Sequence, residues 1–269
     1  MEFVTLNTGI EMPLLGTGTN TYGKLDRRYD GEITGDTSEL ASAIELGYRS
    51  IDTAISYRNE SVIGDAVKQS GLAREEFFIT SKLPGTPEYT ASREAVEKGI
   101  AFSLSQLQVE YIDLYLIHHP WDNLEEIVQV WKVLEEYVDK GVLKAIGVSN
   151  FDVKQLQYLL DHARIKPAVN QVKSHAGNWN DEVIDFGRQH GVVGEAWWPL
   201  SGVDEAARAQ LTEIGDRYGK TWAQVTLRYQ VQRGVIVIPK SHNSERQAAN
   251  IDLFDFELTD DEMLGIAKL

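Results

Sequence analysis

Short apolar runs rich in β-branched side chains alternate along this chain with longer segments whose apolar residues recur at helical spacing. Such alternation is typical of strands that are each followed by a helix and lie side by side in a parallel sheet. The pattern predicts eight strands, over residues 14–18, 48–51, 77–80, 113–117, 145–148, 168–171, 192–196 and 235–238.

Apolar stripes and capping signals indicate helices between these strands. Apolar residues recur at helical spacing in two clear segments, at Val62, Ile63, Ala66 and Val67 and at Leu124, Ile127, Val128, Trp131, Leu134 and Val138. A polar residue followed three positions later by Glu or Gln favours helices after Asp36, Ser244 and Thr259. The segment 204–232 is too long for one helix, so we predict two, separated near Gly219.

Eight strand and helix units follow one another within 269 residues, and no Pro-, Gly- or Ser-rich linker or block of charge divides them. We therefore expect one domain over residues 1–269, an α/β fold of the (β/α)8 TIM barrel type. An open doubly wound sheet is the alternative. Residues 1–12, with a turn at Asn7-Thr8-Gly9, predict a hairpin that closes the barrel bottom. The polar stretch 20–35 predicts a loop at the carboxyl ends of the strands, where barrels hold their active sites.

Composition narrows the classes of function. The formal net charge of −15 disfavours binding to nucleic acid or to an anionic membrane surface, so an anionic ligand must be held locally. The chain has no cysteine, which excludes disulfides, thiolate metal sites and cysteine nucleophiles. No secretory signal or membrane-spanning apolar segment is recognisable, so we expect a cytoplasmic enzyme.

Polar residues gather where the predicted strands end. In a barrel these positions share one rim, although a single Asp or Lys there is more often a solvated loop charge. The strand-end residues are Asp52, Lys82, His118, Ser149, Asn150, Asn170, Gln171 and Lys240, with Tyr57 in the loop after the second strand. Because neighbouring strand residues point to opposite faces, we do not expect His118 and His119 to act together as ligands, and we expect no catalytic metal.

A Tyr, a Lys, an Asp and a His at one rim suit proton transfer to a carbonyl. A nearby ammonium favours the phenolate and lowers the pKa of a phenol from about 10, so Lys82 could tune Tyr57. Asp52 would hold the Lys82 ammonium in place, and His118 could bond the phenol or the carbonyl oxygen. Without a nucleophile or a metal, the other half of such a reaction is hydride from a nicotinamide.

These motifs resemble those of the aldo-keto reductases, in order and spacing, from about residue 6 to the chain end. The segments that carry the resemblance are Ile51-Asp52-Thr53-Ala54, Tyr57-Arg58-Asn59-Glu60, Ser81-Lys82-Leu83, the run from Asp113 to Pro120, Ile146-Gly147-Val148-Ser149-Asn150-Phe151, Asn170-Gln171-Val172 and Ile238-Pro239-Lys240-Ser241. The chain is most similar to short members of prokaryotic or fungal type.

The resemblance implies reduction of aldehydes or ketones with NADPH by the tetrad Asp52, Tyr57, Lys82 and His118. It places Ser149, Asn150 and Gln171 on the nicotinamide carboxamide, Trp197 against the nicotinamide ring, Leu200 beside the cofactor, Lys240, Ser241, Asn243 and Arg246 around the adenosine 2′-phosphate, and Asn250 on adenine. The helix predicted near Ser244 is consistent with this phosphate site, since the free N–H groups at a helix start favour a phosphate. The resemblance also implies a monomer with a small carbonyl substrate.

Several residues depart from the family pattern. Lys173 stands where Glu is usual, Trp198 replaces a small residue on the pyrophosphate side, and Ala249 replaces a Glu near adenine. His119 replaces a frequent Trp in the substrate pocket. The chain ends at Leu269, so we expect it to lack the long C-terminal loop of larger members.

The aromatic residues Tyr22 and Trp121, with His119, are the predicted walls of the substrate pocket, and Trp179 is a further candidate. Two other functions stay open. A barrel of this kind could retain its cofactor as a redox-sensing regulatory subunit with little turnover. Lys82 could instead form a Schiff base in an aldolase, although a neighbouring Asp52 would keep it charged.

Overall fold

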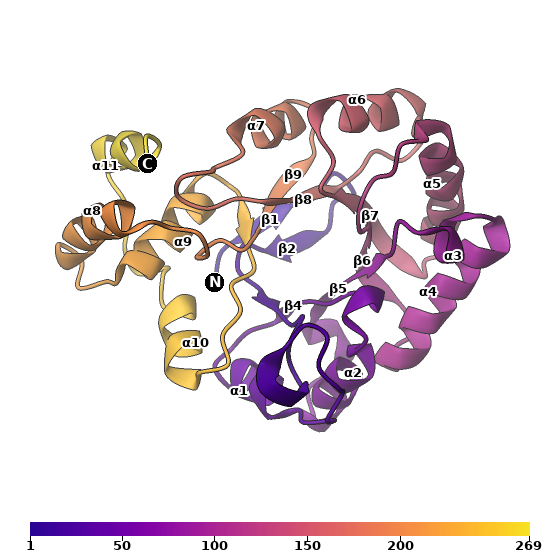
Figure 1. Cartoon of the computed structure of the whole chain (residues 1–269), viewed down its shortest axis with the longest axis horizontal. Coiled ribbons are helices and arrows are strands. Elements are labelled where there is room, and N and C mark those ends of the chain that lie inside the picture. Colours follow the sequence, from indigo (N-terminus) through magenta and orange to yellow (C-terminus); the bar gives the residue numbers. More distant parts are fainter.

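The computed structural model describes residues 1–269 and contains eight parallel strands in sequence order around a barrel (Figure 1). The strands are β3 (Thr17–Gly18), β4 (Ser50–Asp52), β5 (Phe78–Leu83), β6 (Ile112–Ile117), β7 (Leu143–Ser149), β8 (Val169–Lys173), β9 (Val193–Trp197) and β10 (Ile236–Val237). A parallel bridge between Leu15 and Val237 joins the first strand region to the last. This arrangement confirms the predicted (β/α)8 barrel and excludes the open sheet.

Helices surround the strands on the outside of the barrel (Figure 1). They are α1 (Ser38–Glu45), α2 (Glu60–Gln69), α3 (Pro87–Thr90), α4 (Arg93–Leu107), α5 (Leu124–Asp139), α6 (Val153–His162), α7 (Asp181–Gln189), α8 (Glu205–Asp216), α9 (Trp222–Gln232), α10 (Ser244–Ile251) and α11 (Asp260–Ile266), with short 3-10 turns η1 (Leu25–Arg27), η2 (Ile55–Tyr57) and η3 (Arg74–Glu76). None of these helices has the length and apolar character needed to cross a membrane.

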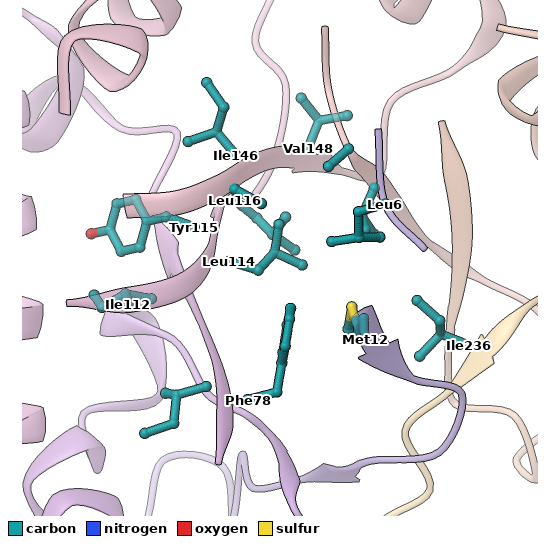
Figure 2. Packing of buried hydrophobic residues seen from close by; sticks show 14 of the residues in the cluster. Leu6, Met12, Phe78, Ile112, Leu114, Tyr115, Leu116, Ile146, Val148 and Ile236 are labelled. Carbon is teal, nitrogen blue, oxygen red and sulfur yellow. The ribbon is translucent and has the colours of Figure 1, made fainter. Parts of the chain in front are cut away.

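The predicted hairpin is present as β1 (Phe3–Thr5) and β2 (Glu11–Pro13), which pair antiparallel. Leu6 and Met12 are buried in the same apolar cluster as the strand residues Leu114 and Ile236. Figure 2 shows the side chains of the hairpin region directed toward those of the strands. The hairpin therefore covers one end of the barrel with apolar side chains and leaves the other end to the polar residues.

Capping signals placed three helix starts at the observed cap or within one residue of it. Thr259 and Glu262 form the predicted capping box, and the break near Gly219 separates α8 from α9. The other two starts lie one residue from the predicted caps: Thr37 precedes α1, and Asn243 caps α10 by accepting from the backbone N–H of Arg246. At α1 the Thr37 side chain makes no capping bond, and the predicted Asp36 accepts from the backbone N–H of Ser38 at 2.9 Å, so the predicted residue still satisfies a free N–H group at this helix start.

Candidate active site

A cavity of about 360 Å³ opens at the carboxyl ends of the strands, a volume within the range of small-molecule sites. It is lined by Gly18, Thr19, Asn20, Tyr29, Asp52, Tyr57, His118, His119, Ser149, Asn150, Gln171, Trp197, Trp198, Pro199, Leu200, Ser201, Ile238, Pro239 and Lys240. Parallel strands end at this rim, so residues far apart in the chain meet here.

Asp52 and Lys82 form a buried ion pair at the cavity floor. The Lys82 Nζ lies 2.7 Å from Asp52 Oδ1 and donates also to the Thr53 carbonyl oxygen at 2.9 Å. The Lys82 side chain is 0% exposed, and burial would lower its pKa, but Asp52 and the other partners together raise it. Lys82 therefore stays an ammonium, which disfavours its use as a Schiff-base nucleophile.

Tyr57 lies at the end of η2, just beyond β4, with its hydroxyl 3.3 Å from Lys82 Nζ. Burial raises the pKa of Tyr57 to about 12, and the opposing effect of Lys82 is smaller. The expected lowering by Lys82 is thus present, but the expected net lowering of the Tyr57 pKa is wrong for this structure, because removal from water outweighs the ammonium. Tyr57 is protonated at neutral pH, the state that a proton donor requires.

The His118 ring meets Tyr57 edge to face, with ring centroids 5.6 Å apart. Burial, with Lys82 and His119 nearby, lowers the pKa of His118 to about 2, so this imidazole is neutral. His118 and His119 stack at 4.5 Å with 12° between their planes, and both line the cavity. The prediction that these two side chains point to opposite faces is wrong. The strand β6 ends at Ile117, so the alternation of side chains along a strand does not extend to His118 and His119.

Asn150 adopts a left-handed backbone with φ of 62° just after β7, a conformation that Asn tolerates. Its Oδ1 accepts from Trp197 Nε1 at 2.9 Å. Its Nδ2 lies 3.1 Å from each of three acceptors, the His118 carbonyl oxygen, His119 Nδ1 and Ser149 Oγ. Within the protein, the Asn150 amide is thus already engaged on both sides, and contact with a carboxamide would need one of these bonds to be exchanged.

Glu195 and Tyr29 belong to this region, although no motif pointed to them. Glu195, on β9, is buried beside Gln171, whose Nε2 donates to it at 2.9 Å. Tyr29 comes from the 20–35 loop, lines the cavity and packs edge to face on Tyr57 at 6.0 Å. A charged residue inside an apolar strand run was the available signal for Glu195, whereas a loop aromatic carries no comparable signal.

Two residues that depart from the family pattern, Lys173 and Trp198, contact each other, with Lys173 Nζ 5.2 Å from the ring centroid of the Trp198 indole. Trp198 is 54% exposed and has a φ of 58°, which is uncommon for a bulky residue. Trp198 and Leu200 both line the cavity. Two departures from the family pattern thus form one cation–π pair at the rim.

The residues predicted for the 2′-phosphate lie at the start of α10. Lys240 lines the cavity, and its Nζ bonds Asn20 Oδ1 at 3.0 Å and Thr21 Oγ1 at 2.7 Å. Ser241 bonds the backbone N–H of Asn243, whereas Arg246 is exposed. Asn250 is buried further along the helix. Like Lys240, the residues Leu200, Trp197, Ser149 and Gln171 line the cavity.

Three aromatic residues lie outside the cavity. The Tyr22 side chain is buried, and its hydroxyl donates to the Ser241 carbonyl oxygen, so Tyr22 supports the α10 segment. Trp121 donates its indole N–H to Glu126, and Trp179 packs in a second apolar cluster. Tyr22, Trp121 and Trp179 thus do not line this cavity, and their expected place in the substrate pocket stays a prediction. The side chains turn toward packing partners that sequence position does not reveal.

Comparisons with known proteins agree with this geometry. The model of the Aldo/keto reductase family matches residues 14–269. Glyoxal reductase of Bacillus subtilis is 42% identical over all of this chain and 92% of that protein, and methylglyoxal reductase DkgA of Escherichia coli K12 is 37% identical over 99% and 92%. The solved aldo-keto reductase AKR2E4 of Bombyx mori, in complex with NADP, has a TM-score of 0.87 at 31% identity, covering 99% of this chain and 92% of that one.

Proposed function

This chain belongs to the aldo-keto reductase family, and we propose that it reduces small aldehydes and ketones with NADPH, with Tyr57 as the proton donor. The observation that carries this proposal is that Asp52, Tyr57 and His118 line one cavity, and that the buried Lys82 bonds both Asp52 and Tyr57. We expect the enzyme to be a monomer in the cytoplasm, as the sequence predicts. The test is NADPH oxidation, followed by absorbance, with aldehydes, ketoesters, α-dicarbonyls and sugars. NADPH binding without turnover would favour the regulatory alternative.

The residues present suit a nicotinamide coenzyme. Trp197 lines the cavity as a flat aromatic wall, and Gln171 lies at its floor with a carbonyl oxygen that accepts no bond within the protein. Lys240 and Arg246 provide two cations in an otherwise acidic chain, next to the N-terminus of α10. The coenzyme would supply hydride to the substrate carbon.

Each side chain of the tetrad has a separate task in the proton transfer. Tyr57 holds a proton at its hydroxyl and passes it to the carbonyl oxygen as negative charge develops there. Lys82, kept charged by Asp52, stabilises the phenolate that remains. The neutral His118 ring, packed against Tyr57, orients the carbonyl oxygen without competing as an acid.

Replacing Lys240 and Arg246 together with Ala is expected to raise the KM for NADPH at least about tenfold, and that for NADH about twofold or less, because only NADPH carries the 2′-phosphate. Steady-state kinetics with both coenzymes measure this. The matched control Lys98→Ala/Lys132→Ala removes two exposed charges on α4 and α5. An unchanged preference between the coenzymes would refute the 2′-phosphate role.

The hydrogen bonds around His119 define its tautomer. The Trp197 indole can only donate, so Asn150 presents its oxygen to Trp197 and its nitrogen to His119 Nδ1. Burial and Lys82 lower the pKa of His119, which is therefore neutral and carries its proton on Nε2. Since Nδ1 is occupied by Asn150, the Nε2–H is the free donor of the His119 ring.

We further propose that this donor selects carbonyl compounds with a second oxygen on the adjacent carbon. The stacked His118 and His119 rings line the same cavity, so their edges suit two neighbouring oxygens of one small molecule. The names of the two bacterial relatives, glyoxal reductase and methylglyoxal reductase, describe substrates of this class. An α-dicarbonyl or α-hydroxycarbonyl compound is thus the proposed substrate.

His119→Phe keeps an aromatic ring stacked on His118 but removes the Nε2–H donor. It is expected to lower kcat/KM for methylglyoxal about tenfold, because one hydrogen bond to the substrate is lost. For propanal, which has no second oxygen, kcat/KM should fall about twofold or less. Comparing variant with wild type for each aldehyde cancels the effect of aldehyde hydration. Equal losses for the two substrates would contradict the proposed selection by His119.

A further inference from the structure

Glu195 is a fully buried carboxyl group that the proton transfer does not use. It projects from β9 toward the cavity floor, where the charged groups facing it are Asp52 and Lys82 and the polar group is Gln171. One of its oxygens, Oε2, accepts from Gln171, and Oε1 has no hydrogen-bond partner. Burying a carboxyl group costs free energy, and here only one of its two oxygens has a hydrogen-bond partner, so packing alone does not explain Glu195.

Gln171 donates both of its amide hydrogens to carboxyl groups. Its Nε2 lies 2.8 Å from Asp52 Oδ2 and 2.9 Å from Glu195 Oε2. The opposite amide orientation would place the Gln171 oxygen against Asp52, which is paired with Lys82 and has no proton to donate. The amide nitrogen therefore points inward, and the Gln171 carbonyl oxygen is the atom available to a ligand.

We propose that Glu195 is a positioning residue that holds the Gln171 amide in this orientation, so that the cavity floor offers an acceptor to the NH2 group of a carboxamide. This inference rests on the proposed binding of a nicotinamide coenzyme. Asp52 alone can satisfy one N–H of Gln171, and the second N–H needs Glu195. Glu195 does not line the cavity, whereas Gln171 does, so Glu195 would act on the coenzyme only through Gln171.

The protonation of Glu195 agrees with this role. Burial, followed by the charge of Asp52, raises the pKa of Glu195 to about 8. Both effects favour the neutral acid, whose oxygen still accepts from Gln171, beside the single ion pair of Asp52 with Lys82. A Gln at position 195 would reproduce the neutral acid, whereas a Leu would remove the acceptor.

The experiment compares NADPH with its 3-acetylpyridine analogue, in which a methyl ketone replaces the carboxamide and so lacks the NH2 donor. Binding constants come from quenching of tryptophan fluorescence, and thermal unfolding verifies that each variant is folded. We expect wild type to prefer NADPH over the analogue about tenfold, the value of one hydrogen bond. Glu195→Gln should keep that preference, and Glu195→Leu should reduce it to about twofold or less.

If Glu195→Leu does not fold, Glu195→Met removes the same acceptor with a more adaptable side chain. A folded Leu or Met variant that prefers NADPH as wild type does would overturn the inference, and so would a wild type that binds both coenzymes equally. Failure of wild type to bind NADPH would instead refute the proposed function. The two failures are distinguishable because binding is measured without turnover.

Discussion

Replacing Tyr57 with Phe is expected to lower kcat about 1000-fold while leaving the Kd for NADPH within about twofold, because general acid catalysis contributes factors of this size. The phenol hydroxyl lies 3.3 Å from Lys82 Nζ and is the proposed proton donor, whereas the proposed coenzyme contacts are made by other residues. Phe keeps the ring that packs against His118 and Tyr29. NADPH oxidation measures the first quantity and fluorescence titration the second.

The matched control is Tyr158→Phe, which removes a hydroxyl from α6, outside the cavity. It should leave kcat within about twofold of wild type, since a surface substitution away from the site rarely matters. Losses of kcat and of NADPH affinity by the same factor in Tyr57→Phe would show that Tyr57 acts in coenzyme binding, and the assignment as proton donor would then be abandoned.

Replacing Lys82 with Met is expected to reduce the free energy of unfolding by about 3–5 kcal/mol, because it leaves the Asp52 carboxylate buried without its cation. The same change should lower kcat at least about 100-fold, since Tyr57 loses the charge that stabilises its phenolate. Denaturant unfolding gives the stability and the NADPH assay gives the rate.

The double variant Lys82→Met/Asp52→Asn separates these two effects. It removes the uncompensated charge, so it should regain part of the lost stability, but the rate should stay low. The control is Lys98→Met, which replaces an exposed lysine on α4 and should change the free energy of unfolding and kcat only slightly. A Lys82→Met protein as stable as wild type would show that the ion pair does not stabilise the barrel floor.

Local periodicity was sufficient to predict the barrel because each strand and helix is recognised over a short window. All eight predicted strands overlap β3 to β10, and the hairpin and the break between α8 and α9 also lie where the pattern placed them. The errors are at edges: residues 14–18 shrink to Thr17–Gly18, and two caps shift by one residue. Boundaries depend on which hydrogen bonds form between strands and at helix ends, and a single window does not contain these partners.

Side-chain direction at the site was not predictable from the sequence. Tyr22 and Trp121 lie close in sequence to residues of the cavity, yet their side chains pack elsewhere. His118 and His119 share the cavity because the strand ends before them. Rotamers beyond the strand ends are chosen by neighbours from other units of the barrel.

The sequence by itself determined that polar residues end the strands of a barrel, which brings Asp52, Tyr57, Lys82 and His118 to one rim. Only the tertiary structure decided the pKa values and the hydrogen-bond partners of the residues at this rim. It decided that Tyr57 has its pKa raised, because burial is a property of the packed site, and that Gln171 lies between Asp52 and Glu195. Solvation and hydrogen-bond partners are set by residues distant in the chain, and these become neighbours only after folding.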